Sequence, residues 1–371
     1  MQIKLQACVL AGALALTGAI ARGGKNASPA AHIVVGDSVE IRSTDKSLGT
    51  ITATIDAVVD EPGETAVSAD RLASLAASFA AGAQVALNTT SGGMRIFCGN
   101  SRCRLNVIPI ADLPPPIAID GMVSVIEISA ADCLRLMEPI AAAGHEDTRY
   151  YLNAIFLHSI AARLVGVATD GLRLIRTDIA AGEFSIDRTC IVPARTSIAL
   201  RKILMQTKPS RVVIRRSKSL IEFSTREFRF VSRLIDGGTG YPGYEAVVPQ
   251  PAPNWLICNR RELLSALARL TAVSTADRAQ AALSWGDNAG RLNVFLARQP
   301  ADGLDLVNAE THGAAKVAVP IGQIMAMLDE FAGANIHIET AGEQPVVFRD
   351  GDKLALIVRA KWNFNSEEAA A

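Results

Sequence analysis

One stretch, present three times in the chain, decides the fold. The middle copy is PARTSIALRKILMQTKPSRVVIRRSKSLIEFSTREFRFVSRLI, from Pro193 to Ile235. The others are SADRLASLAASFAAGAQVALNTTSGGMRIFCGNSRCRLNVIP, from Ser68 to Pro109, and PIGQIMAMLDEFAGANIHIETAGEQPVVFRDGDKLALIVRAKW, from Pro320 to Trp362. The copies begin about 125 residues apart, which is the size of a small domain and too long for a solenoid repeat. We therefore expect one domain used three times.

Each copy opens with a helix pattern and continues with strand patterns. The apolar residues expected on one helical face are Leu72, Leu75 and Phe79, then Ile198, Ile203 and Leu204, then Ile321, Ile324, Met325 and Leu328. Alternating strands and polar turns follow, as in 220–223 and 228–230. A further strand, helix and strands precede each copy, with helices expected at 7–21, from Ser129, and at 260–270. The predicted class is α+β, with two helices and a mostly antiparallel sheet in each domain.

Proline-rich stretches mark the expected domain boundaries. The first is Asp112–Pro116 (DLPPP) and the second is Pro249–Pro253 (PQPAP). Neither can continue a helix or a central strand. The sequence thus predicts domains at 1–119, 120–250 and 251–371, the last with a short polar tail.

Composition excludes several classes of protein. Of the 371 residues, 49% are hydrophobic and 20% are charged, which suits cored domains rather than disorder. Lys+Arg and Asp+Glu both number 37, so the chain lacks the overall positive charge of a typical nucleic-acid binder, although basic residues can gather on one surface. The 6 Cys and 5 His show no metal-ligand spacing, which predicts free thiols in a reducing, cytoplasmic setting and no metal.

The N-terminal apolar run permits two interpretations. Lys4 precedes Ala7–Ala21 (ACVLAGALALTGAIA), a pattern typical of a secretory signal. The same run is also typical of a buried first helix that ends at Arg22–Lys25, with glycines and basic residues at its C-terminus. The first interpretation would make the chain a secreted three-domain binding protein.

Three motifs carry a resemblance to a known family. They are Arg149–Asn153 (RYYLN), Ala168–Leu174 (ATDGLRL) and Tyr241–Pro249 (YPGYEAVVP). With these motifs the chain resembles the bacterial DNA sliding clamp, the β subunit of the replicative DNA polymerase. The resemblance extends over nearly the whole chain and is weakest from Met1 to Lys46. The resemblance implies a clamp fold in which two chains join head to tail as a ring, with sheets outside and helices lining a hole around duplex DNA. It also makes 7–21 the first helix rather than a signal.

The resemblance implies a non-catalytic, cytoplasmic processivity factor without a cofactor or a membrane partner. A clamp must slide, so its phosphate contacts should be weak and independent of sequence, while ring closure supplies retention. The residues expected to face DNA are Arg22, Lys25, Arg71, Arg135, Arg149, Tyr150, Tyr151, Arg195, Arg201, Lys202, Arg260, Arg261 and Arg278. For any single one, a solvated charge or a packed aromatic ring is the alternative.

The resemblance also implies a cleft that holds polymerases and the clamp loader through a short apolar peptide. The matching residues are Leu152, Thr169, Gly171, Leu172, Arg173, Leu174, Pro242, Val247 and Val358. Leu152, Leu174 and Val247 could instead be core residues. The family usually has His where this chain has Leu172, and basic residues where it has Glu245 and Ala246. These departures suggest altered partner specificity, as in a divergent second clamp.

The expected dimer interface is the edge strand that contains Arg102, Cys103, Arg104 and Leu105. The two arginines are expected to pair with acidic residues of the last domain. Family clamps place bulky apolar residues here, and a cysteine buries less apolar surface than an aromatic ring. The sequence therefore predicts a dimer weaker than usual. An enzyme built on Asp170 with His145 or His158 is disfavoured, because no recognised catalytic motif accompanies these residues.

Overall fold

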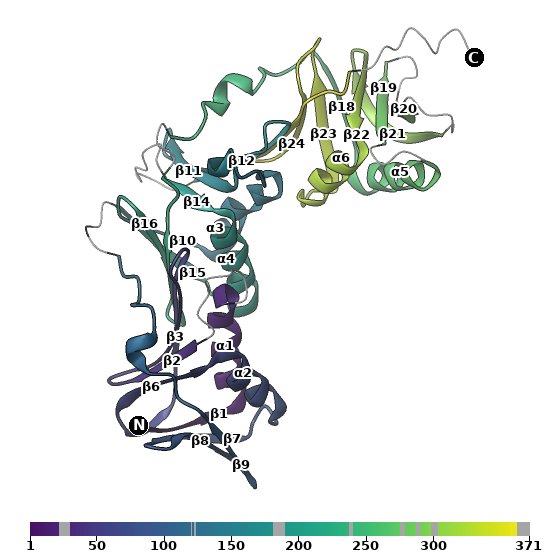
Figure 1. The fold of residues 1–371 in the computed structure, drawn as a ribbon. Coiled ribbons are helices and arrows are strands. Elements are labelled where there is room, and N and C mark those ends of the chain that lie inside the picture. The colour runs from purple at the N-terminus through teal and green to yellow at the C-terminus, as the bar shows by residue number, and fades with distance from the viewer. Residues whose placement is uncertain are drawn as a thin grey trace. The chain divides into compact units, whose positions relative to one another are not determined.

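The computed structural model describes residues 1–21, 30–119, 121, 124–180, 190–236, 240–274, 279–286, 290–297 and 303–361. They form two compact units (Figure 1). Unit 1 comprises Met1–Met137 and Ala181–Gly237, and unit 2 comprises Glu138–Ala180 and Gly238–Ala371. The α+β class predicted from the sequence is confirmed, whereas the three domain boundaries stay a prediction.

Unit 1 contains two antiparallel sheets. The five-stranded sheet has the order β5 (Val58–Glu61), β1 (Gln2–Gln6), β7 (Gln84–Thr90), β8 (Gly93–Cys98), β9 (Ser101–Leu105). The eight-stranded sheet has the order β10 (Ser124–Ser129), β15 (Arg211–Arg216), β16 (Leu220–Ser224), β17 (Phe228–Arg233), β4 (Gly49–Ile55), β3 (Val39–Asp45), β2 (Ala30–Val35), β6 (Gly63–Ser68). The short strand β14 (Ile191–Pro193) leads into a helix.

The helices of unit 1 pack on these sheets and on one another. They are α1 (Ala7–Ala21), α2 (Ala69–Ser78), α3 (Ala130–Met137) and α4 (Ala194–Thr207), with the 3₁₀ turn η1 (Ile110–Asp112). Helix α1 contacts β3 and β4 as well as α2 and α4. Leu10, Leu14, Leu16 and Ile20 are therefore all buried, which explains why the run is apolar on nearly every side. The prediction that this run forms the first helix is confirmed.

One detail of the helix predictions is confirmed and two are wrong. Ser129 caps α3, because its Oγ accepts a hydrogen bond from the Asp132 N–H at 3.0 Å, as predicted. Phe79 does not extend the apolar face of α2, since the helix ends at Ser78 and Phe79 is extended. Ile198 is 58% exposed rather than buried. The buried side of α4 instead includes the small residues Thr196 and Ala199, which let the helix lie close to its neighbours.

Unit 2 has a long run of antiparallel strands. Their order is β11 (Ala154–Ile160), β12 (Arg163–Thr169), β13 (Arg173–Ala180), β25 (Lys353–Ile357), β24 (Val346–Asp350), β23 (Asn335–Thr340), β18 (Asn254–Asn259), β21 (Leu304–His312), β20 (Arg291–Ala297), β19 (Gln280–Trp285), β22 (Ala315–Pro320). Helices α5 (Arg260–Val273) and α6 (Ile321–Asp329) pack together over a core that includes Leu267, Trp285, Ile324 and Phe348.

Three 3₁₀ turns complete unit 2, namely η2 (Glu138–Ala142), η3 (Tyr150–Leu152) and η4 (Tyr244–Val247). The first motif, Arg149–Asn153, contains the turn η3. The Ala168–Leu174 motif does span a strand pair and its turn, β12 to β13. Among the described helices, none combines the length and the hydrophobicity that a membrane span needs.

Two strand pairs join successive repeats in the same register. In unit 1, β4 pairs with β17, with Thr52 opposite Arg229. In unit 2, β13 pairs with β25, with Arg176 opposite Leu354. We call these the β4–β17 junction and the β13–β25 junction.

Matching backbone hydrogen bonds bound the two junctions. At one end the Arg233 N–H donates to the Leu48 carbonyl, and the Val358 N–H donates to the Leu172 carbonyl, both at 2.8 Å. At the other end the Thr54 N–H donates to the Glu227 carbonyl at 2.9 Å, and the Asp178 N–H donates to the Asp352 carbonyl at 3.1 Å. We call the first the turn end and the second the hairpin end. Since the backbones match, differences between the junctions arise from their side chains.

Candidate functional site

The turn between β12 and β13 in unit 2 is held by two side chains. Asp170 Oδ1 accepts hydrogen bonds from the Leu172 and Arg173 N–H groups, both at 2.9 Å, and its Oδ2 accepts one from Arg173 Nε at 2.9 Å. Thr169 Oγ1 donates to the Arg173 carbonyl at 2.7 Å and accepts from the Gly171 N–H at 3.0 Å. Gly171 has φ +93°, a conformation that favours glycine. The sequence Thr-Asp-Gly therefore specifies a rigid turn.

This turn presents apolar side chains to solvent. Leu172 is 55% exposed and Val358, bonded to it through the backbone, is 43% exposed. Val247, at the end of η4, is 54% exposed. Exposed apolar side chains that gather on one surface mark an interaction site more often than scattered ones do. Leu172 and Val358 form such a pair at the turn end of the β13–β25 junction.

Other residues predicted for the cleft lie beneath this surface. Leu152 and Leu174 are 5% and 1% exposed, so the structure places both in the core. Their backbones still fix the site, because Leu174 follows the turn in β13 and Leu152 ends η3. The sequence motifs do not separate the residues that support this surface from the residues that form it.

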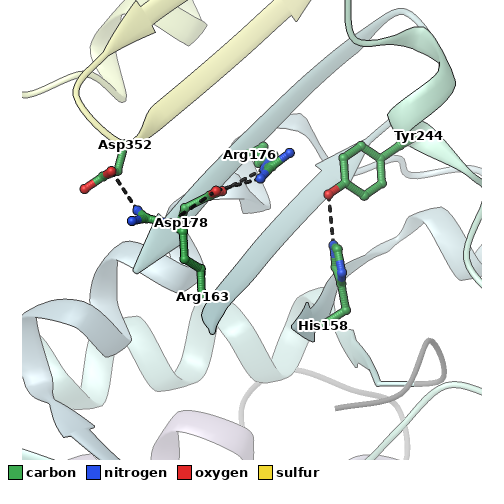
Figure 2. A network of polar contacts seen from close by, with 6 residues as sticks. All are labelled: His158, Arg163, Arg176, Asp178, Tyr244 and Asp352. Atoms are coloured by element: carbon green, nitrogen blue, oxygen red, sulfur yellow. Dashed lines mark hydrogen bonds and ion pairs between the residues drawn. The ribbon is translucent and has the colours of Figure 1, made fainter. Parts of the chain in front are cut away.

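A buried aromatic cluster anchors the segment that contains Pro242 and Val247. The Phe156 ring stacks on Tyr241 and on His158, with centroids 4.8 Å and 4.6 Å apart. A hydrogen bond of 2.9 Å joins His158 Nε2 and the Tyr244 hydroxyl, as Figure 2 shows. Tyr241 also accepts a hydrogen bond from the Thr169 N–H at 3.2 Å, and burial raises the pKa of its phenol. This contact ties the segment that carries the exposed Pro242 to the turn. The sequence motif gave the tyrosines but not their partners.

Arg149, predicted to face DNA, lies beside the turn. A Cβ added to Gly171 would be 3.0 Å from an Nη atom of Arg149, and the guanidinium pairs with Glu146 at 2.8 Å. The glycine therefore leaves room for an arginine at the rim of the apolar surface.

The turn end of the β4–β17 junction in unit 1 is closed. Asp45 plays the part of Asp170, accepting from the Ser47 and Leu48 N–H groups at 2.8 Å and 3.2 Å. Its Oδ2 also pairs with Arg195 at 2.9 Å. Burial alone would raise the pKa of Asp45, but the hydrogen bonds from Ser47 and Arg195 outweigh it and lower the pKa. Leu48 is only 4% exposed, so this end presents no apolar surface.

Comparisons with known proteins agree with this geometry. A family model described as the central domain of the DNA polymerase III beta subunit matches residues 128–242. The beta sliding clamp of Caulobacter vibrioides (strain NA1000 / CB15N) is 28% identical over 246 residues, which cover 64% of this chain and 65% of that protein. The Escherichia coli K12 beta sliding clamp is 31% identical over 218 residues, 58% of each chain. The chain thus matches just under two thirds of the length of the first of these relatives.

Solved structures extend the match to the whole fold. A crystal structure of the Caulobacter crescentus beta sliding clamp has a TM-score of 0.87 at 22% identity, covering 97% of this chain and 99% of the other. The DNA polymerase III subunit beta from Pseudomonas aeruginosa has a TM-score of 0.86 at 23% identity, covering 97% and 100%. The chain is therefore similar in sequence to bacterial sliding clamps over part of its length, and it has their fold.

Several basic residues that the sliding clamp resemblance assigned to DNA lie on helices. Arg71 is exposed on α2, Lys202 on α4 and Arg261 on α5, while Arg135 on α3 and Arg201 on α4 are half-buried. Tyr150 is 50% exposed and its ring lies edge to face against Tyr151, with centroids 5.9 Å apart. Arg22, Lys25 and Arg278 lie outside the described residues.

Arg149, described above, pairs with Glu146, and two further basic residues are held by the fold. Arg195 pairs with the buried Asp45, as described above. Arg260, at the start of α5, donates to the carbonyls of Leu328 and Gly333 at 3.1 Å and 3.0 Å, where it sits at the C-terminal end of α6. A cation there complements the negative end of the helix dipole. Both contacts reduce the freedom of these arginines to follow a phosphate backbone.

The predicted interface residues of the clamp lie on β9, at the edge of the five-stranded sheet. Arg102 and Arg104 are exposed, and Cys103 and Leu105 are half-buried. All six cysteines are free, as predicted, and burial raises the pKa of the Cys133 and Cys258 thiols to about 12. Cys103 is therefore more accessible to a partner surface than either of these buried thiols.

Proposed function

We propose that this chain is a non-catalytic processivity factor, acting in the cytoplasm, of which two copies close head to tail around duplex DNA and tether a DNA polymerase. The observation that carries the proposal is the repeated junction register. Three repeats form two junctions within one chain. The strand of the third repeat that corresponds to β4 is β21, and the strand of the first repeat that corresponds to β25 is β9. These two strands remain available to form the same junction between two copies.

Strand pairings identify the residues that would meet. In the first repeat Ala66 pairs with His32, His32 with Arg42, and Arg42 with Thr52. In the last repeat Ala318 pairs with Ala282, Ala282 with Phe295, and Phe295 with Leu304. Leu304 therefore corresponds to Thr52, and it is 66% exposed.

The hairpins give the other partner. The β8–β9 turn follows the Cys98–Ser101 pair, and the β24–β25 turn follows the Asp350–Lys353 pair. Arg102 hence corresponds to Leu354 in the third repeat and to Arg229 in the second. Leu354 lies opposite Arg176, and Arg229 lies opposite Thr52. We therefore expect Arg102 of one copy to lie opposite Leu304 of the other, with Cys103 opposite Gly303.

Crosslinking tests this register. Directly opposed residues of an antiparallel pair have Cα atoms about 4.5–5.5 Å apart, within disulfide range. We expect Arg102→Cys with Leu304→Cys, in a Cys103→Ser background, to oxidise to a covalently closed dimer. Arg102→Cys with Leu306→Cys moves one partner by two residues and serves as the control. Equal crosslinking of both pairs, or none in either, would contradict the register.

Retention on DNA tests the ring itself. After loading onto nicked circular DNA with the host clamp loader and ATP, a closed ring should resist a high-salt wash and leave once the circle is cut. Phosphate contacts alone weaken steeply as salt rises. Salt-resistant retention that ends on linearisation supports the clamp, and release by salt on an uncut circle overturns it. Arg71, Lys202 and Arg261 are the lining residues whose combined loss should weaken DNA contact without opening the ring.

We further propose that the polymerase and the loader bind the turn end of the β13–β25 junction through a short apolar peptide. The exposed Leu172, Val358 and Val247 support this, as does the anchored Pro242 beside them. A rigid apolar surface with polar neighbours suits a small hydrophobic anchor. Leu172 replaces a polar side chain that the family usually has, so we expect a more apolar peptide.

A further inference from the structure

The hairpin end of the β4–β17 junction in unit 1 contains an open groove of about 570 Å³. Four arginines line it, Arg211, Arg215, Arg226 and Arg229, together with hydroxyl side chains that include Thr54 and Thr225. We propose that this groove binds a carboxylate-rich segment of a partner protein. The proposal is independent of DNA encirclement and of the apolar peptide surface in unit 2.

The groove has more positive charge than its own carboxylates neutralise. Arg211 pairs with Glu127, and Arg215 pairs with Glu222 at 2.6 Å. The remaining acidic lining residue, Glu40, is held by Arg42 at 2.9 Å. Arg226 and Arg229 are exposed, and within the described residues neither has an ion pair. Two arginines therefore stand in the groove without a counter-ion.

The matching place in unit 2 shows what a neutralised version looks like. There Asp178 takes hydrogen bonds from Arg176 at 2.7 Å and 2.6 Å, and Arg163 joins Asp178 to Asp352 at 3.6 Å and 2.6 Å (Figure 2). Hydrogen bonding to Asp178 raises the pKa of Arg176 and so stabilises its charge. At this end both arginines have carboxylate partners within the unit.

The register shows which side chains make the difference. Thr54 stands where unit 2 has Asp178, and Thr52 stands where it has Arg176. Glu227 corresponds to Asp352, but its Oε2 accepts a hydrogen bond from Thr225 at 2.9 Å instead of pairing with an arginine. A hydroxyl thus replaces the carboxylate of Asp178 in unit 1, which leaves the charges of Arg226 and Arg229 for a ligand to balance.

The side chains of the groove favour a carboxylate ligand over a nucleic acid. An arginine guanidinium is a planar fork of donors that matches a carboxylate in two parallel hydrogen bonds. The aromatic lining residue, Phe228, is 1% exposed, so it offers no ring on which a base could stack. Recognition of acidic segments by arginine clusters is an established mode of peptide binding.

Peptide binding to the full-length protein tests the proposal. The probe is a fluorescein-labelled hexaglutamate peptide, the reference peptide is hexaglutamine, and anisotropy is measured at about 50 mM and about 300 mM NaCl. We expect hexaglutamate to bind, hexaglutamine not to bind, and affinity to fall as salt rises. Arg226→Ser with Arg229→Ser should weaken binding roughly tenfold, since each exposed charge pair contributes only a few-fold.

Two further variants distinguish binding at the groove from a general attraction of the peptide to positive charge on the protein. Lys218→Ser with Arg291→Ser removes two exposed positive charges elsewhere and should leave hexaglutamate affinity unchanged. Thr54→Asp copies the carboxylate of unit 2 and should weaken binding by filling the groove with an internal partner. Equal loss in both double variants, no hexaglutamate binding at low salt, or competition by single-stranded DNA that exceeds competition by unlabelled hexaglutamate would each overturn the proposal. DNA retention on nicked circles should be unchanged in the groove variants, so this result stands apart from the ring test.

Discussion

The two junctions share a backbone and differ in which end is open. In unit 1 the turn end is closed by Asp45, Arg195 and Leu48, and the hairpin end is an open basic groove. In unit 2 the turn end presents Leu172 and Val358, and the hairpin end is closed by ion pairs. One strand pairing thus supports a core contact or a binding surface, depending on a few side chains at its two ends.

The physical difference is how each end satisfies its polar and apolar groups. At a closed end the arginines pair with carboxylates of the same chain, and in unit 1 the leucine is buried. Such an end has neither an unpaired charge nor an exposed apolar side chain for a partner to bind. An open end leaves apolar area in water, as at Leu172, or charge without a counter-ion, as at Arg229. Substitutions at matching positions should therefore affect stability on the closed ends and binding on the open ends.

The largest effect on stability is expected at the matching leucines. Leu48→Ala removes a buried side chain and should lower the free energy of unfolding by roughly 2–4 kcal/mol. Leu172→Ala, at the corresponding exposed position, should change it by less than about 0.5 kcal/mol. Urea denaturation followed by circular dichroism measures both. Similar costs at the two positions would show that the ends do not differ as described.

The next effect is expected at Asp45. Asp45→Asn removes the charge that Ser47, Leu48 and Arg195 stabilise, and should cost roughly 1–3 kcal/mol at neutral pH. Since the pKa of Asp45 is lowered in the folded state, its contribution is complete above about pH 4 and is lost as the pH falls through the folded pKa. The gap in unfolding free energy between wild type and variant should therefore close below about pH 4. A gap that persists unchanged at pH about 2 would rule out the ionised carboxylate as its source.

A smaller effect is expected at the closed hairpin end of unit 2. Asp178→Asn weakens the contacts with Arg163 and Arg176, both partly open to solvent, and should cost about 1 kcal/mol. The cost should shrink at high salt, because exposed ion pairs are screened. Thr54→Asn changes the matching position in unit 1 and is the control, with little expected change. A larger cost for Thr54→Asn than for Asp178→Asn would reverse the assignment of open and closed ends.

Local patterns in the sequence predicted most elements but not how their ends are completed. The strands at 220–223 and 228–230, the Ser129 cap and the first helix followed from short-range periodicity and capping chemistry. The wrong assignment of Ile198 came from the same periodicity, because the buried face of α4 passes through Ala199 and Leu200 to Ile203 and Leu204 and leaves Ile198 outside it. Asp45 meets Arg195 across 150 residues, and Asp178 meets Asp352 through Arg163. No local pattern reports such partners, so the closed ends and the basic groove appear only in the folded chain.

The smallest effect on stability should accompany a large loss of peptide affinity, at the open turn end of unit 2. Leu172→Asp places a charge where the side chain is already in water, so the free energy of unfolding should change by less than about 0.5 kcal/mol. An apolar peptide that binds here would have to bury the new carboxylate, and removing that charge from water costs free energy. Capture of a labelled Leu- and Phe-containing peptide should therefore weaken at least tenfold. Ile198→Asp, at an exposed apolar residue of unit 1, is the matched control and should leave peptide capture intact. If Leu172→Asp binds the peptide as well as wild type does, the apolar surface at this turn is not the polymerase-binding cleft, although the ring test would be unaffected.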